Sequence, residues 1–181
     1  MKPAKQGHFD GACGLYSIGN ALSLLSKRTK TDEIFYTLFN FFCKKYGNAE
    51  IILFEGISRN QLNDILTNTI KILQLDLKIY RPFWNNSAKS ISDFHKILAD
   101  EVNENQSAAI IGYEYSKFND GDYCSHWTVI KKTTEKSLFT YDSHNENKII
   151  SIKKCRIWDD FQKHKIKPYK ISSTDTFIIY K

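Results

Sequence analysis

The sequence predicts an α+β fold in which helices come first and antiparallel strands come second. Two observations carry this prediction. Apolar residues recur every three or four positions through most of the first hundred residues, as on one face of a helix. From residue 107 onward they alternate in short runs separated by turn-type residues, which is typical of strands. This segregated order defines the α+β class, and 181 residues are expected to form a single domain, 1–181.

Four helices are expected in the first part of the chain. The first has its apolar positions at helical spacing: Leu15, Ile18, Leu22 and Leu25. The third begins near Ser58, where "SRNQ" matches the capping-box pattern S-x-x-Q. The four expected helices cover residues 12–26, about 31–46, a segment from about 58, and 90–105.

Strands are expected on either side of the fourth helix. "LDLKIY" (75–80) alternates like a half-buried strand, and Asn and Gly residues mark turns among the later strands. A short helix is expected around 158–161, before the last strand. The later strands are expected at 107–115, 125–132, 137–143, 147–154 and 176–180.

Composition excludes several classes of function. The net charge of +6 comes from 22 lysines and four arginines, and dispersed lysines indicate a solvated surface rather than a nucleic-acid interface. Apolar stretches are only a few residues long, so neither a membrane span nor a signal peptide is expected. We therefore expect a cytoplasmic protein, or one delivered by a specialised secretion system. Its four widely spaced cysteines are expected to be reduced.

Cys13 stands at the junction between a turn and the first expected helix, within "QGHFDGACGLYSIGNAL" (6–22). The thiolate is the nucleophilic form of cysteine, and a helix N-terminus or a protonated histidine stabilises it. Gly14 is expected to leave room for a substrate carbonyl beside the backbone. Gln6 offers a neutral N–H donor of the kind that stabilises an oxyanion. This stretch therefore has the composition of half an active site.

A base and its orienting group are expected on the strands. His126 opens the apolar run "HWTVI", and Asp142 lies sixteen residues later at the end of "LFTYDS". In an antiparallel pair, the start of one strand lies beside the end of the next. Asp142 can then hold one ring nitrogen of His126 and leave the other for Cys13. This is the nucleophile–base–orienter arrangement of a catalytic triad.

Together these motifs resemble the papain-like cysteine peptidases, and in particular the compact bacterial branch with bacteriocin-leader peptidases and papain-like effector deamidases. The resemblance implies a helical lobe packed on an antiparallel sheet, with the site in the cleft between them. It implies that Cys13 is the nucleophile, His126 the general base and Asp142 its orienter. Gln6 and the Cys13 backbone N–H would bind the oxyanion, although Gln6 lies one residue further from the cysteine than is usual in the family.

Other roles are compatible with the same residues. Asp142 could cap a turn, and His144 could replace it as the orienter. A zinc site would need the ligand set Cys124, His126, His144 and Cys155, whose spacing matches no common zinc motif. The acidic run "FNDGDY" lacks the later Glu of a calcium loop. We therefore expect no metal and no cofactor.

The expected function is thiol-dependent hydrolysis of an amide, with a protein or peptide as substrate. Cleavage of a peptide bond is the leading version. Deamidation or transamidation of a glutamine would use the same residues. A catalytically silent papain-like binding module is the alternative from another class.

Overall fold

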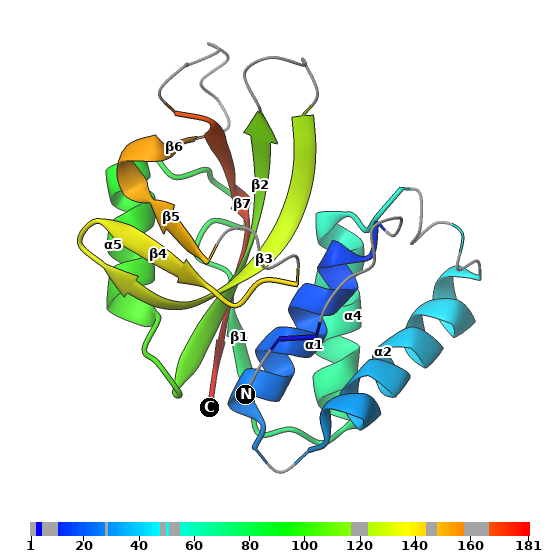
Figure 1. Cartoon of the computed structure of the whole chain (residues 1–181). Coiled ribbons are helices and arrows are strands. Elements are labelled where there is room, and N and C mark those ends of the chain that lie inside the picture. The colour runs from blue at the N-terminus through cyan, green and yellow to red at the C-terminus, as the bar shows by residue number, and fades with distance from the viewer. Residues whose placement is uncertain are drawn as a thin grey trace.

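The structure is a computed structural model that describes residues 3–4, 11–27, 29–47, 50, 55–116, 123–143, 148–157 and 167–181. Three helices, α1 (Cys13–Leu25), α2 (Thr31–Tyr46) and α4 (Arg59–Ile72), gather on one side of a sheet (Figure 1). A fourth helix, α5 (Ile91–Glu101), lies against the opposite face. The α+β prediction is confirmed, with the helical part packed on the sheet.

The sheet has seven strands among the described residues, in the order β1-β7-β2-β3-β4-β5 with β6 beside β7. All pairs are antiparallel except the short β6–β7 pair. The strands are β1 (Lys78–Tyr80), β2 (Ser107–Ser116), β3 (Tyr123–Thr134), β4 (Ser137–Thr140), β5 (Ile149–Ser151), β6 (Cys155–Ile157) and β7 (Tyr169–Tyr180).

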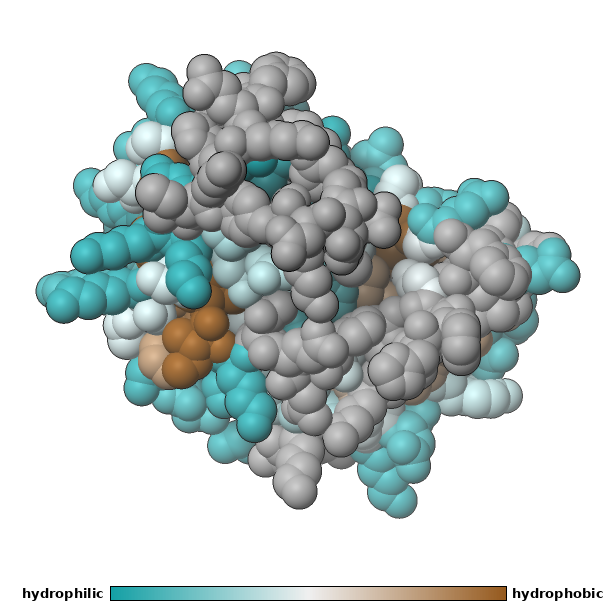
Figure 2. All heavy atoms as spheres, turned by 45° about the horizontal axis from the view of Figure 1, so that its top comes forward, coloured by the Kyte–Doolittle hydropathy of each residue, from teal (hydrophilic) through white to brown (hydrophobic). Residues whose placement is uncertain are grey.

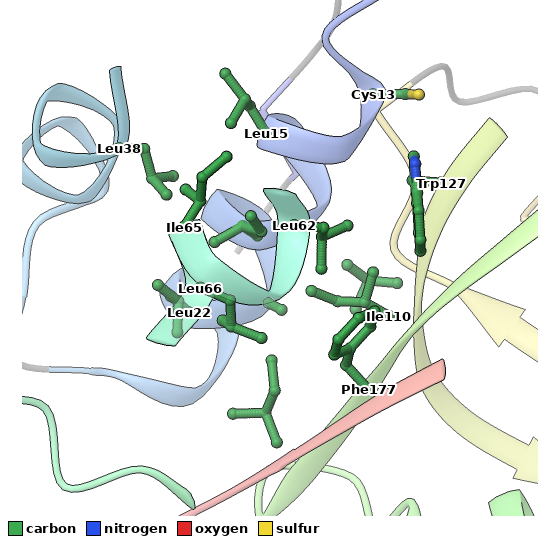
Figure 3. Close-up of a cluster of buried hydrophobic side chains, with 14 of the residues drawn as sticks. Cys13, Leu15, Leu22, Leu38, Leu62, Ile65, Leu66, Ile110, Trp127 and Phe177 are labelled. Atoms are coloured by element: carbon green, nitrogen blue, oxygen red, sulfur yellow. The ribbon is translucent and has the colours of Figure 1, made fainter. Parts of the chain in front are cut away.

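Alternation along the central strands supplies a separate core on each face of the sheet. Ala108 and Ile110 of β2 face the helical side, while Ala109 and Ile111 face α5, as the two-residue period of a strand requires. The first core contains leucines and isoleucines of α1, α2 and α4, and Figure 3 shows many of them converging on Ile110 and Phe177. This core fixes the start of α1 against β3.

Local sequence explains where α4 begins. The Ser58 hydroxyl accepts a hydrogen bond from the backbone N–H of Gln61, and the Gln61 side chain accepts one from the backbone N–H of Ser58. Both halves of the expected capping box are therefore present.

Several boundaries differ from the prediction. The helix expected over 90–105 ends at Glu101, and Asn105 takes a left-handed φ of 71° in the turn that follows. The strand expected over 147–154 is interrupted by a 3₁₀ turn (Ile152–Lys154), which leads the chain from β5 to β6. The helix expected around 158–161 lies outside the described residues.

The last strand, β7, is seven residues longer at its start than the expected strand 176–180. Its middle contains Ser172 to Asp175, residue types that usually form loops. They are accommodated by a β-bulge, because Ile111 pairs with Thr176 while the next residue, Gly112, pairs with Ser172.

The surface fits the lysine-rich composition. Most of the coloured residues on the face in Figure 2 are hydrophilic, with hydrophobic residues showing only in limited areas. No helix within the described ranges is long and apolar enough to cross a membrane.

Phe177 is the most instructive core residue to remove. It is fully buried and packs against the rings of Trp84 and Trp127, with centroids 6.0 and 6.2 Å away. We expect Phe177→Ala to lower the free energy of unfolding in urea by about 3–5 kcal/mol, because a large cavity remains. Phe39 of α2 is 42% exposed, so Phe39→Ala should cost about 1 kcal/mol or less. Equal losses for both variants would contradict the assigned core.

Candidate active site

Cys13 is the first residue of α1. The preceding residue, Ala12, provides no side-chain cap, so the first backbone N–H groups of the helix have no side-chain acceptor at that position. Cys13 as a whole residue is 9% exposed. In Figure 3 its sulfur lies on the side of Trp127, away from the leucines that fill the core. The prediction that Cys13 lies in the first turn of a helix is confirmed.

Gly14 has a different role from the one expected. A Cβ at this position would collide with the side chain of Ile57 and come within 3.3 Å of the Trp127 ring. The space beside Gly14 is therefore filled by protein rather than left for a substrate carbonyl. The indole N–H of Trp127 also donates to the Ile57 carbonyl oxygen at 3.2 Å. Gly14 thus allows residue 57, the start of α1 and strand β3 to meet beside the thiol.

His126 and Asp142 form a buried pair. Nε2 of His126 lies 3.0 and 3.2 Å from the two carboxylate oxygens of Asp142. The histidine is 8% exposed and the aspartate 5%. Strand β4 ends at Thr140, earlier than expected, but Tyr141 still donates its N–H to the carbonyl of Val129 at 2.7 Å. This extra backbone bond brings Asp142 within reach of the imidazole on the neighbouring strand.

The side chain of Cys13 lies close enough to the imidazole to act on its pKa. Burial lowers the pKa of His126, but the hydrogen bonds and negative charges of Asp142 and Cys13 outweigh it and raise the pKa to about 9. The ring of Tyr113 packs edge-on against the imidazole, with centroids 5.5 Å apart. A protonated histidine beside a cysteine is a partner that stabilises the thiolate form.

The other described cysteines have no such surroundings. Cys155 is fully buried, its Sγ donates to the Ser151 carbonyl, and burial raises its pKa to about 12. Cys43 is exposed on α2. Both residues are free thiols, as is Cys13. Within the described part of the chain, Cys13 is therefore the cysteine best suited to react as a thiolate.

Two of the expected participants are not placed. Gln6 and His144 lie outside the described residues, so the oxyanion donor and the rival orienter stay predictions. The side chain of Cys124, one of the considered zinc ligands, is also not described. Across the described ranges, no three His, Cys, Asp or Glu side chains are grouped closely enough to hold a metal ion.

Sequence reasoning missed two residues of the site. Ile57 supplies the carbonyl that holds Trp127, and Tyr113 packs on the imidazole. Tyr113 pairs directly with His126 in the β2–β3 register. Pairing the two expected strands across their turn could therefore have indicated that Tyr113 lies beside His126. The capping box at Ser58 indicates that Ile57 precedes a helix, but nothing in the sequence indicates that Ile57 lies beside Gly14 and Trp127.

The pH dependence of stability follows from the raised pKa of His126. In the unfolded chain the pKa of a histidine is near 6.5. The interactions of protonated His126 therefore stabilise the folded protein fully below about pH 6.5, and this stabilisation is lost as the pH rises through about 9. We expect the free energy of unfolding in urea to fall between pH 6.5 and pH 9.5. His126→Gln has no imidazole to titrate, so it should show a smaller fall. An equal fall in both proteins would contradict the assigned environment.

The helices packed on an antiparallel sheet form the fold that the resemblance to papain-like peptidases implies. Among solved structures, the chain is similar to a Bacillus anthracis protein described as a C39-like peptidase. The TM-score is 0.51 at 14% sequence identity, and the match covers 98% of this chain and 92% of the other. No protein-family profile matches the chain, and no curated protein matches it in sequence. The expected papain-like fold of the compact bacterial branch is thus confirmed.

Proposed function

We propose that the protein is a thiol-dependent hydrolase that cleaves peptide bonds, with Cys13 as nucleophile, His126 as general acid and base, and Asp142 as its orienter. One observation carries the proposal. The imidazole of His126 hydrogen-bonds to Asp142, and the side chain of Cys13, at the start of α1, also raises the pKa of that imidazole. The likeness to a protein described as a C39-like peptidase supports a peptide as the substrate.

The first half of the reaction forms a thioester. The Cys13 thiolate attacks the carbonyl carbon, forming a C–S bond and an oxyanion. The Cys13 backbone N–H and, as the sequence predicts, Gln6 would donate to that oxyanion. Protonated His126 then gives its proton to the amide nitrogen, and the C–N bond breaks.

The second half restores the enzyme. Neutral His126 removes a proton from water, and the oxygen attacks the thioester carbon. The C–S bond breaks, which releases the acid and returns the thiolate beside the imidazolium. Asp142 stays deprotonated throughout the reaction and hydrogen-bonds to Nε2 of His126, so that the other ring nitrogen faces the reacting groups.

Covalent trapping tests the site directly. Native protein is treated with iodoacetamide for a short time, and the modified cysteine is mapped by mass spectrometry. We expect Cys13 to react faster than Cys43 and Cys155, and faster in the native than in the urea-unfolded protein. If Cys13 reacts no faster in the native state, the thiolate assignment fails and a silent binding module explains the fold better.

A second measurement identifies the bond that is broken. Substrate proteins are incubated with the enzyme and their intact masses are recorded. Both reactions use the same acyl-transfer chemistry, so the residues of the site do not distinguish them. Peptide-bond cleavage yields fragments, whereas deamidation of a glutamine side chain raises the mass of the intact substrate by roughly one dalton. Fragments are the expected result.

A further inference from the structure

A small cavity lies directly beside the candidate catalytic base. It has a volume of about 190 Å³, and its wall includes His126 and Trp127 of β3 and Ile57 before α4. The cavity therefore adjoins the imidazole, which is the group that links it to Cys13. A substrate held at Cys13 would place a neighbouring side chain at its mouth.

The bulge in β7 carries an acidic group into this cavity. The three extra residues of the bulge end at Asp175, which lines the cavity together with Ser172 and Gly112. A Cβ on Gly112 would lie 2.9 Å from the Cβ of Asp175, so only glycine leaves room for the aspartate here. Ser173 anchors the bulge, because its hydroxyl accepts a hydrogen bond from the Ala88 N–H at 2.9 Å.

The carboxylate of Asp175 has little to neutralise it. It is half-buried, its hydrogen-bond partner among the described residues is Ser172, and it forms no ion pair with them. Burial raises the pKa of Asp175 even though the Ser172 hydrogen bond and the charge of Arg59 both lower it. An incoming cation would restore the favourable surroundings that the charged form lacks.

Two cationic groups lie in the described cavity wall: the protonated His126, which is paired with Asp142, and Arg59, which is held by another residue. For Arg59 the partner is Trp84. Its guanidinium stacks on the Trp84 ring at 4.7 Å, and Nη1 donates to the Trp84 carbonyl at 3.5 Å. Its charge acts on Asp175 from beyond ion-pair distance. This leaves the carboxylate available to a side chain that enters from the site.

We infer that this cavity is a specificity subsite that receives a lysine or arginine side chain from the acyl part of the substrate, with Asp175 as its ion-pair partner. This inference rests on the proposed function, since it deepens the assignment of the same site. An ionised hydrogen bond in a partly buried cavity is strong enough to favour a basic residue over a neutral one by about tenfold.

Peptidyl vinyl sulfones test the inference without requiring turnover. A set of probes carries Lys, Arg, Gln, Leu or Glu at each of the two positions before the electrophile. The rate of Cys13 modification is measured by intact mass and peptide mapping. For wild-type protein we expect Lys and Arg at one position to react about tenfold faster than Leu, and Glu to react slowest.

Substitutions at Asp175 and Arg59 separate the effects of these two charges in the cavity. Asp175→Asn should reduce the preference for Lys to about twofold or less, while Arg59→Gln should keep or increase it, because it removes the competing cation. Asp100→Asn, an exposed position on α5, is the matched control and should behave as wild type. Asp175→Lys should favour the Glu probe.

Three results would overturn the inference. The first is that the wild type shows no preference for basic probes, and the second is that Asp175→Asn keeps the preference of the wild type. The third is that the Gln probe reacts fastest and that its rate falls in both Asp175→Asn and Arg59→Gln. The last result would indicate an amide-binding subsite. Iodoacetamide labelling of Cys13 in every variant shows whether the thiolate itself is intact. If it is intact and basic probes are not preferred, only the subsite falls. If it is absent, the proposed function falls as well.

Discussion

Cys13→Ala should abolish hydrolysis, with a loss on the order of 10⁶-fold, the size expected when the nucleophile of a triad is removed. Without the sulfur no thioester forms, and what remains is the small contribution of binding and oxyanion stabilisation. The change deletes one atom from a side chain at the edge of the core, so the fold should persist. Fragment formation followed by mass spectrometry measures activity, and urea unfolding measures stability.

Cys43→Ala is the matched control for this change. Cys43 is exposed on α2 and lies outside both hydrophobic cores, so the variant should keep full activity. Its exposure also predicts almost no effect on the free energy of unfolding. Activity in folded Cys13→Ala equal to that of the wild type would refute the mechanism.

Asp142→Ala should lower activity by roughly 10²–10⁴-fold, the range over which a positioned acid–base group contributes. The carboxylate raises the pKa of His126 by a hydrogen bond and by its charge. Without it, burial and the weaker remaining interactions move that pKa downward from about 9. The alkaline limb of the pH–activity profile should therefore move toward neutral pH, since the leaving amine needs the protonated imidazole.

The pH profile separates this role from a structural one. Asp142→Asn keeps a hydrogen-bonding group of similar size but removes the charge, so it should also move the alkaline limb toward neutral pH. A turn-capping role, which the sequence leaves open for Asp142, predicts lower stability with an unmoved limb. An unmoved limb in both variants would exclude the orienting role.

Local patterns were sufficient to predict most of the fold. The capping box at Ser58 depends on residues three positions apart, and the structure contains both of its hydrogen bonds. The boundaries of α2, Thr31–Tyr46, agree with the expected range of about 31–46, because polar starting residues and an apolar stripe coincide there. The start of β7 was missed because Ser172 to Asp175 pair through a bulge, which depends on a distant glycine rather than on neighbouring residues.

The candidate site could be assembled from sequence only in outline. The residue types and order of Cys13, His126 and Asp142 indicated a triad, and register arguments indicated that the last two would be neighbours. The structure brings all three together. The reason for Gly14 was assigned wrongly, because the sequence does not reveal that Ile57 occupies the space beside it.

The sequence by itself determined the class of the fold, the helix that begins at Cys13, and the strands that carry His126 and Asp142. These features depend on periodicity and capping, which act over a few neighbouring residues. Only the tertiary structure decided which groups surround the thiol and that Asp175 enters a cavity beside the imidazole. Those features depend on the pairing of β2 with β7 and the packing of α1 on β3, contacts between residues far apart in the chain.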